Sequence, residues 1–365
     1  MIITCSEIEI ILNELLARKK EEISLLSIYG PELLFNYNLE DQKLYLKTTR
    51  SSWRTFIQNI VRNHSLTKYA EKELPQFDDI IKSVTSAGIS KPEGIDVLIE
   101  EIKTYLAPVK RMNRRKRFLI ALDTNQLIDN LMSSYIENEF SAPVNQQVRN
   151  FISYVISSWV LYERDNFLRR ERNRGIKELN EKLSDFEYYL PEKIDRMARL
   201  GYSIYSELKS LEESYDQLES KLPSTQRYEI LKEKNLKDQA IIDEYDDYKK
   251  SLKDVKFVFI SADDQAFALA KDRFESIKIK VQNRIPNNLG CSIENGAKLI
   301  YQLTLFLGFL RVNNYNIRFS IHYSGKEHND WENKQLKFEC SDRNFEERIT
   351  SLISLTRKLN SINNS

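Results

Sequence analysis

The sequence has little glycine, cysteine and histidine. Nine glycines among 365 residues leave few positions for tight hairpins, and together with 30% charged residues they favour a helix-rich chain. The three cysteines, Cys5, Cys291 and Cys340, are far apart and form no C-x-x-C pair, which argues against a zinc site and against a disulfide framework. The three histidines show no metal-ligand spacing, and no glycine-rich phosphate loop is present.

Neither sign of charge is in excess, and no apolar run is long. Lys and Arg number 55 against 54 Asp and Glu, so any attraction to nucleic acid must come from local patches. The longest apolar run, residues 299–310, is too short to span a bilayer, and no secretory signal pattern is present. We therefore expect a cytoplasmic protein with no membrane partner.

Helical periodicity dominates the first third of the chain. Apolar residues fall on one helical stripe over residues 6–29, and further stripes cover residues 53–61 and 95–106. These stripes predict an all-α N-terminal domain over residues 1–110. The period of residues 33–47 fits neither helix nor strand clearly.

The middle of the chain alternates strands and helices. The runs "FLIAL" at residues 118–122 and "VKFVFI" at 255–260 are short and apolar, as strands covered on both faces should be, and "IKIKV" at 277–281 is a candidate third strand. Helical segments between them predict a parallel sheet, hence an α/β domain over residues 111–286. Residues 287–365 predict a small α+β extension, with a helix, a β-hairpin and a final helix.

Residues 172–232 interrupt this alternation. From Ile176 to Leu222 the apolar positions step by three and four, the spacing of a coiled-coil seam, and Pro191 divides the stretch in two. We expect an inserted helical hairpin or arm whose apolar stripe packs on itself, on the N-terminal domain or on a second copy of the chain. A homodimer would use this arm or the C-terminal extension.

Four acids stand near the ends of the predicted strands and helices: Asp123, Glu163, Asp238 and Asp263. Each has a purely structural explanation. Asp123 can cap a helix, Asp238 can complement a helix dipole, and Glu163 can pair with a neighbouring arginine. Near Asp263, Ser261 can act as the cap with Asp264 completing a capping box.

The order of these acids resembles that of the PIN-domain nuclease family. The resemblance covers about residues 116–286, less the inserted arm, and rests on "LDTNQLID", "VISSWVLYERDNFLRR", "LKDQAIIDEY" and "FVFISADDQAFALAKD". It implies a PIN-like parallel sheet flanked by helices, whose acids gather at the carboxyl edge, hold Mg²⁺ or Mn²⁺ and hydrolyse phosphodiesters. By position, it implies catalytic and metal-binding roles for Asp123, Glu163, Asp238 and Asp263, and it matches Asn125 and Ser261 to the polar positions beside the first and last acids.

Physical arguments support the same chemistry. Converging carboxylates repel one another unless a cation neutralises them, and oxygen ligands select hard cations such as Mg²⁺ or Mn²⁺. A run of arginines follows the second acid and predicts salt-dependent contact with nucleic acid: Arg164, Arg169, Arg170, Arg172 and Arg174.

The sequence therefore predicts a metal-dependent nuclease that cuts RNA rather than DNA. Two alternatives remain open: a catalytically inactive PIN-like scaffold that binds RNA or a protein, and a structure-specific DNA nuclease related to the flap enzymes.

Overall fold

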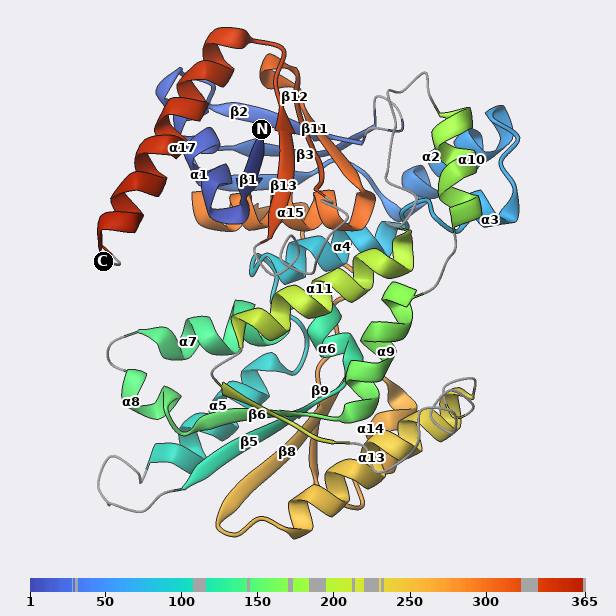
Figure 1. The fold of residues 1–365 in the computed structure, drawn as a ribbon, viewed down its shortest axis with the longest axis vertical. Coiled ribbons are helices and arrows are strands. Elements are labelled where there is room, and N and C mark those ends of the chain that lie inside the picture. Colours follow the sequence, from blue (N-terminus) through green and yellow to red (C-terminus); the bar gives the residue numbers. More distant parts are fainter. Residues whose placement is uncertain are drawn as a thin grey trace. The chain divides into compact units, whose positions relative to one another are not determined.

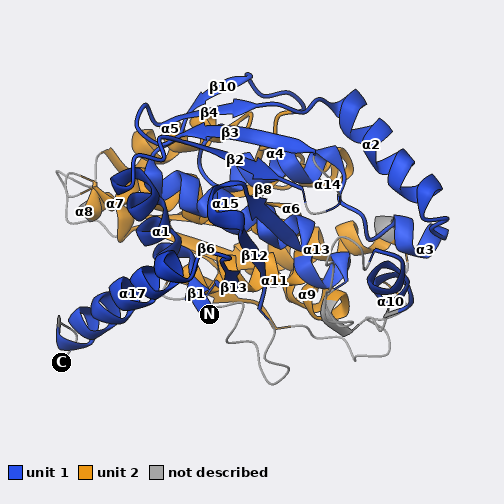
Figure 2. Ribbon diagram, turned by 90° about the horizontal axis from the view of Figure 1, so that it is seen from above, with its two compact units in different colours: residues 1–90, 171–199, 283–365 blue, residues 91–170, 200–282 orange. Residues whose placement is uncertain are grey.

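The computed structural model divides the chain into two compact units, coloured separately in Figure 2. Unit 1 contains Met1–Ser90, Glu171–Arg199 and Asn283–Ser365, and unit 2 contains Lys91–Arg170 and Leu200–Gln282. The structure describes residues 1–27, 29, 32–107, 116–142, 145–169, 173–183, 195–211, 214–219, 230, 233–322 and 334–363.

Unit 1 is built on an eight-stranded sheet whose strand pairs are all antiparallel. In spatial order its strands are β1 (Ile2–Thr4), β13 (Gln335–Glu339), β12 (Ile317–Ile321), β11 (Phe309–Val312), β2 (Glu22–Leu26), β3 (Leu33–Asn38), β4 (Lys43–Leu46) and β10 (Asn288–Gly290). Strands from the N-terminal and the C-terminal parts of the chain therefore share one sheet.

The helices of unit 1 lie against this sheet or form a separate group beside it (Figure 1). They are α1 (Cys5–Ala17), α2 (Arg50–Asn63), α3 (Lys68–Glu71), α4 (Phe77–Ser86), α10 (Asn173–Lys182), α15 (Ile293–Leu307) and α17 (Arg343–Asn363). The central helix α15 is buried over nearly its whole length and contacts α1, α4 and the sheet. Gly296 permits this close packing, because a Cβ there would lie 2.5 Å from the ring of Tyr37.

The prediction of an all-α N-terminal domain is wrong. Helix α1 ends at Ala17, Lys19 takes a left-handed φ of 59°, and the chain turns into β2. Ile23 and Leu25 are buried in β2 by alternation, although Ile23 and Leu26 also fit a helical spacing. The ambiguous residues 33–47 contain β3 and β4, so the sheet pairing decided what local periodicity could not.

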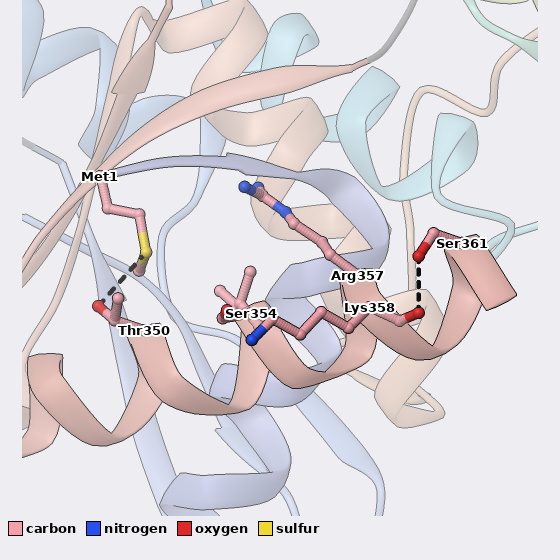
Figure 3. Close-up of a pocket in the computed structure, with 7 residues that line it drawn as sticks. Met1, Thr350, Ser354, Arg357, Lys358 and Ser361 are labelled. Carbon is pink, nitrogen blue, oxygen red and sulfur yellow. Dashed lines mark hydrogen bonds between the residues drawn. The ribbon is translucent and has the colours of Figure 1, made fainter.

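The predicted C-terminal elements form, but within unit 1. Strands β12 and β13 are the predicted hairpin, and α17 is the final helix. The Arg357 side chain pairs with Glu7 and donates to the Ile2 carbonyl, which holds α17 against the N-terminal segment. A pocket of about 330 Å³ lies between Met1 and α17 (Figure 3). Residues 1–90 and 283–365 thus fold together, which differs from the predicted separate domains 1–110 and 287–365.

Unit 2 contains a five-stranded, entirely parallel sheet. Its order is β7 (Tyr215–Gln217), β6 (Ile152–Ile156), β5 (Arg117–Leu122), β8 (Val255–Ser261) and β9 (Glu275–Lys278). Phe118 to Leu122 are all buried, as expected for a central strand covered on both faces. The predicted parallel sheet is confirmed.

Helices flank this sheet in the manner of a PIN-like α/β fold. They are α5 (Ile95–Leu106), α6 (Thr124–Ile128), a π-helix (Met132–Glu137), α7 (Asn138–Ser141), α8 (Gln146–Arg149), α9 (Ser158–Arg169), α13 (Lys234–Lys250) and α14 (Asp264–Ala270). Among the described residues, no helix combines the length and apolar character needed to cross a bilayer.

Within residues 172–232 the structure describes a helix on each side of Pro191, as predicted, and also the strand β7, so the described part of the insertion is not helical throughout. Helix α10 belongs to unit 1. There Ile176, Leu179 and Leu183 share a core cluster with Leu66 and Leu74. Of the three predicted packing partners, this one is the N-terminal part of the chain, to which Leu66 and Leu74 belong. Helix α11 (Arg196–Ser210) contributes to both units, and β7 extends the parallel sheet, so the seam spacing concealed a strand.

Candidate active site

Asp123 follows β5 directly, at the carboxyl edge of the parallel sheet. It is the N-cap of α6, with its Oδ1 accepting from the Thr124 N–H at 2.7 Å. Its Oδ2 accepts from the Ser261 hydroxyl at 2.7 Å, and Ser261 ends β8, the strand that lies beside β5 (Figure 1). Asp123 is 5% exposed, so two donors fix a nearly buried carboxyl.

Ser261 connects Asp123 to Asp263. The Ser261 hydroxyl oxygen accepts from the Asp263 N–H at 3.0 Å while it donates to Asp123. The Asp263 carboxylate caps α14 by accepting from the N–H groups of Gln265 and Ala266. The cap of this helix is therefore Asp263, not Ser261 with Asp264, and Asp264 instead pairs with Lys278.

Glu163 and Asp238 meet at a lysine. The Thr124 hydroxyl donates to Glu163 Oε2 at 2.6 Å, and Glu163 Oε1 accepts from Lys237 Nζ at 2.9 Å. The same ammonium lies 3.9 Å from Asp238 Oδ1. Glu163 comes from α9, whereas Lys237 and Asp238 come from α13.

Hydrogen bonds and ion pairs thus connect all four predicted acids in one network. It runs from the Asp263 backbone through Ser261, Asp123, Thr124, Glu163 and Lys237 to Asp238. Its acids come from segments far apart in the chain, as a site at the edge of an open α/β sheet should. Asn125, the remaining predicted residue, is half-buried in α6.

Burial and charge act in opposite directions here. Burial raises the pKa of the Asp123 carboxyl above its usual value, and the hydrogen bond from Ser261 and the charge of Lys237 offset part of that rise. For Lys237, burial lowers the pKa, but Glu163, Asp123 and Asp238 raise it by more. The pKa of Lys237 therefore stays above its ordinary value, and the ammonium form persists.

Several residues that stabilise the carboxyl edge of the parallel sheet were not predicted from the sequence. Glu244 accepts from the backbone and hydroxyl of Ser158, which begins α9. The Tyr245 hydroxyl donates to the Leu122 carbonyl at 2.6 Å and accepts from the Ser157 N–H at 2.9 Å. Lys237 was missed although it directly precedes Asp238; a cation beside a predicted metal-binding acid is a usable sequence signal.

Of the predicted arginine run, only Arg164 and Arg174 have side chains that the structure describes, and they belong to different units. Arg164 pairs with Asp165 and lies over the Tyr205 ring at 4.1 Å, so internal contacts engage its guanidinium. The Arg169 side chain, Arg170 and Arg172 lie outside the described residues. Arg174 belongs to α10 in unit 1.

Arg174 lines a cavity of about 540 Å³ in unit 1. Its guanidinium lies 4.9 Å from the centre of the Tyr69 ring, and Tyr69 is 57% exposed. Lys72 and Arg196 line the same cavity, although Arg196 is already paired with Asp79. This cavity offers cations and an exposed aromatic ring, the groups that bind phosphates and stack bases.

The described part of the chain contains no preformed metal-binding cluster. No group of three or more His, Cys, Asp or Glu side chains there is arranged to hold a metal ion. The oxygen donors suit Mg²⁺ or Mn²⁺ in kind, but the Lys237 ammonium stands between Glu163 and Asp238.

Comparison with known families agrees with the fold. The family model described as PIN domain matches residues 120–274, which includes all four acids. Residues 120–274 therefore match a PIN domain, and the resemblance predicted from the motifs is confirmed. PIN domains are generally nucleases, they bind nucleic acid, and they typically use divalent metals. None of the curated proteins and none of the solved structures compared with the chain gives a match.

Proposed function

We propose that this protein is a metal-dependent nuclease that hydrolyses phosphodiester bonds, with RNA rather than DNA as its substrate. The observation that carries the proposal is the network that connects Asp123, Glu163, Asp238 and Asp263 at the carboxyl edge of the PIN sheet. The predicted cytoplasmic location and the predicted homodimer are part of this proposal.

The chain's own residues have distinct roles in it. Asp123 and Asp263 provide carboxylates fixed by helix N-termini, and Ser261 sets their separation through its hydroxyl. Glu163 provides a carboxylate from α9 and Asp238 provides one from α13. Asn125 provides a polar group in the first turn of α6. A bound Mg²⁺ or Mn²⁺ would supply positive charge against the developing charge on the scissile phosphate.

Nucleic acid would also contact the cavity around Arg174. Arg174 and Lys72 offer charges to phosphates, and Tyr69 offers a ring for stacking. A substrate held through its backbone in this way would be bound with little sequence preference and with strong salt dependence.

A specific observation favours the alternative of an inactive scaffold. Lys237 already neutralises Glu163, and a site balanced by its own lysine can persist without metal. In that case the PIN domain would bind RNA or a protein without cleaving it.

A cleavage assay separates these functions. Labelled single-stranded RNA, hairpin RNA, single-stranded DNA and branched DNA are incubated with Mn²⁺, Mg²⁺ or EDTA, using wild type, Asp123→Asn and the control Asp264→Asn. Asp264 is a suitable control because its exposed carboxylate pairs with Lys278 outside the network. Circular dichroism verifies that each variant is folded.

We expect RNA cleavage that requires metal, falls by at least about a hundredfold in Asp123→Asn and persists in Asp264→Asn. Cleavage that survives EDTA or the Asp123 substitution contradicts the proposal. Binding without cleavage by wild type supports the scaffold, and preference for branched DNA supports a flap-type nuclease.

A further inference from the structure

The Lys237 ammonium lies between two acids of the PIN site. It donates to Glu163 at 2.9 Å and lies 3.9 Å from Asp238. The side chains of Lys237 and Glu163 are each only 16% exposed. The ion pair is therefore largely shielded from water, unlike the exposed pairs elsewhere on α13.

The Lys237 ammonium interacts with more than one acid of this cluster. Asp123, Glu163 and Asp238 all act on Lys237 electrostatically, so three carboxylates face one ammonium. A divalent cation carries twice the charge of the lysine and would neutralise the cluster further. Lys237 donates to Glu163 Oε1 and Thr124 donates to Oε2, so a divalent cation approaching Glu163 would compete with the ammonium for this carboxylate.

We propose that Lys237 is a tethered cation that holds the acidic cluster together in the absence of metal, and that a divalent cation binds Glu163 and Asp238 only by displacing the Lys237 ammonium. This inference rests on the cation requirement of the proposed function. It accounts for a PIN site with the expected acids but without metal-binding geometry among the described residues.

Two consequences follow from this competition. The apparent affinity for the divalent cation is lower than the carboxylates alone would give, because each binding event breaks the Lys237–Glu163 pair. The lysine side chain also becomes accessible when the cation is bound.

The first test uses the wild-type protein. Lysine acetylation by a water-soluble reagent is measured by mass spectrometry with and without Mn²⁺, and Lys250 on the same helix serves as the internal reference because it is largely exposed. We expect Lys237 to be labelled slowly without metal and on the order of tenfold faster with saturating Mn²⁺, while Lys250 is unchanged. Unchanged labelling of Lys237 at saturating Mn²⁺ overturns the proposal.

The second test measures Mn²⁺ affinity by electron paramagnetic resonance. Lys237→Gln removes the competitor, Lys237→Arg retains a cation, and Lys250→Gln removes a lysine of α13 outside the cluster. We expect Kd for Mn²⁺ to fall by about tenfold or more in Lys237→Gln and to stay near wild type in the other two variants. Should Lys237→Gln fail to fold, the labelling experiment on wild type decides alone.

The outcomes distinguish this inference from the proposed nuclease function. An equal or weaker Mn²⁺ affinity in Lys237→Gln, in a wild type that cleaves with Mn²⁺, overturns the tethered cation and leaves the nuclease. If the variants show the expected Mn²⁺ affinities but wild type cleaves no substrate, the tethered cation is supported and the nuclease function is contradicted. Absence of Mn²⁺ binding in every variant overturns both.

Discussion

At the scale of single residues, Ser261 shows how one hydroxyl organises two acids. It is completely buried, donates to Asp123 and accepts from the backbone of Asp263. A buried carboxyl without such donors would be costly, because burial penalises its charged form. Two hydrogen bonds make the buried Asp123 carboxyl tolerable, and they fix its orientation at the edge of the sheet.

The cysteines give a prediction at this scale. Burial raises the pKa of the Cys5 thiol to about 11 and that of Cys291 to about 12. Only the thiolate reacts, so iodoacetamide at pH 8 should alkylate Cys5 on the order of a hundredfold, and Cys291 on the order of a thousandfold, more slowly than an ordinary exposed thiol. Because the pKa is raised, the rate should increase roughly tenfold for each pH unit above 8 while the protein stays folded.

Mass spectrometry of alkylated peptides measures these rates, with protein in urea as the control. Unfolding removes burial, so both residues should react rapidly in urea at the same pH. Equal rates in the folded and unfolded protein would show that the thiols are not protected as the structure implies.

At the scale of elements, the packing of α10 depends on a glycine. Gly175 faces α3, where a Cβ would lie 2.7 Å from the Tyr69 carbonyl and 2.9 Å from Glu73 Cγ. Glu178 of α10 also accepts from the Thr67 N–H at 2.8 Å, just before α3. The close approach of the two helices brings Arg174 over the Tyr69 ring and so forms one wall of the cavity.

We expect Gly175→Ala to lower the free energy of unfolding by about 1–2 kcal/mol. Overpacking costs about 1–3 kcal/mol, and the better helix propensity of alanine recovers up to about 1 kcal/mol. Gly290→Ala is the matched control, since nothing lies within 4 Å of a Cβ there, and it should change stability by less than about 0.5 kcal/mol. Urea unfolding of both variants is the measurement, and equal effects would contradict the close-packing argument.

At the scale of the whole molecule, unit 1 joins the two ends of the chain. β1 pairs with β13, and the Met1 amino group donates to the Phe338 carbonyl at 2.8 Å. Helix α17 buries Phe345, Ile349 and Ile353. Burying such side chains contributes about 1.5–3 kcal/mol each, so the C-terminal segment is part of the fold of unit 1.

Truncation before residue 334 should therefore unfold unit 1. Without β13, strands β1 and β12 lose their shared partner, and the apolar contacts of α17 disappear. Hydrogen exchange of peptides from β2 and β12 should become fast, whereas truncation after Leu359 removes only an exposed end of α17 and should leave exchange unchanged. If β12 stays protected from hydrogen exchange in the protein truncated before residue 334, unit 1 does not need the C-terminal segment.

The sequence predicted those parts of the structure whose local signal is unambiguous. The apolar runs around Ile120 and Val258 could be recognised as buried strands, and the stripe of residues 95–106 as a helix, because each pattern fits one period only. The strand β2 was taken for helix because Ile23 and Leu26 fit a helical spacing, although Ile23 and Leu25 are the residues buried by alternation. The strand β7 was not predicted because its first residue, Tyr215, also fits the coiled-coil spacing.

The candidate site also has features that the sequence predicted and features that only the tertiary structure decided. The identity and order of Asp123, Glu163, Asp238 and Asp263 could be recognised in the sequence, since motif residues stay close to the strand or helix that carries them. The tertiary structure decided that Ser261 bridges two acids, that Lys237 balances two others, and that Arg164 and Arg174 belong to different units. These relations depend on distances between residues remote in the chain, and only the packing of strands and helices fixes such distances.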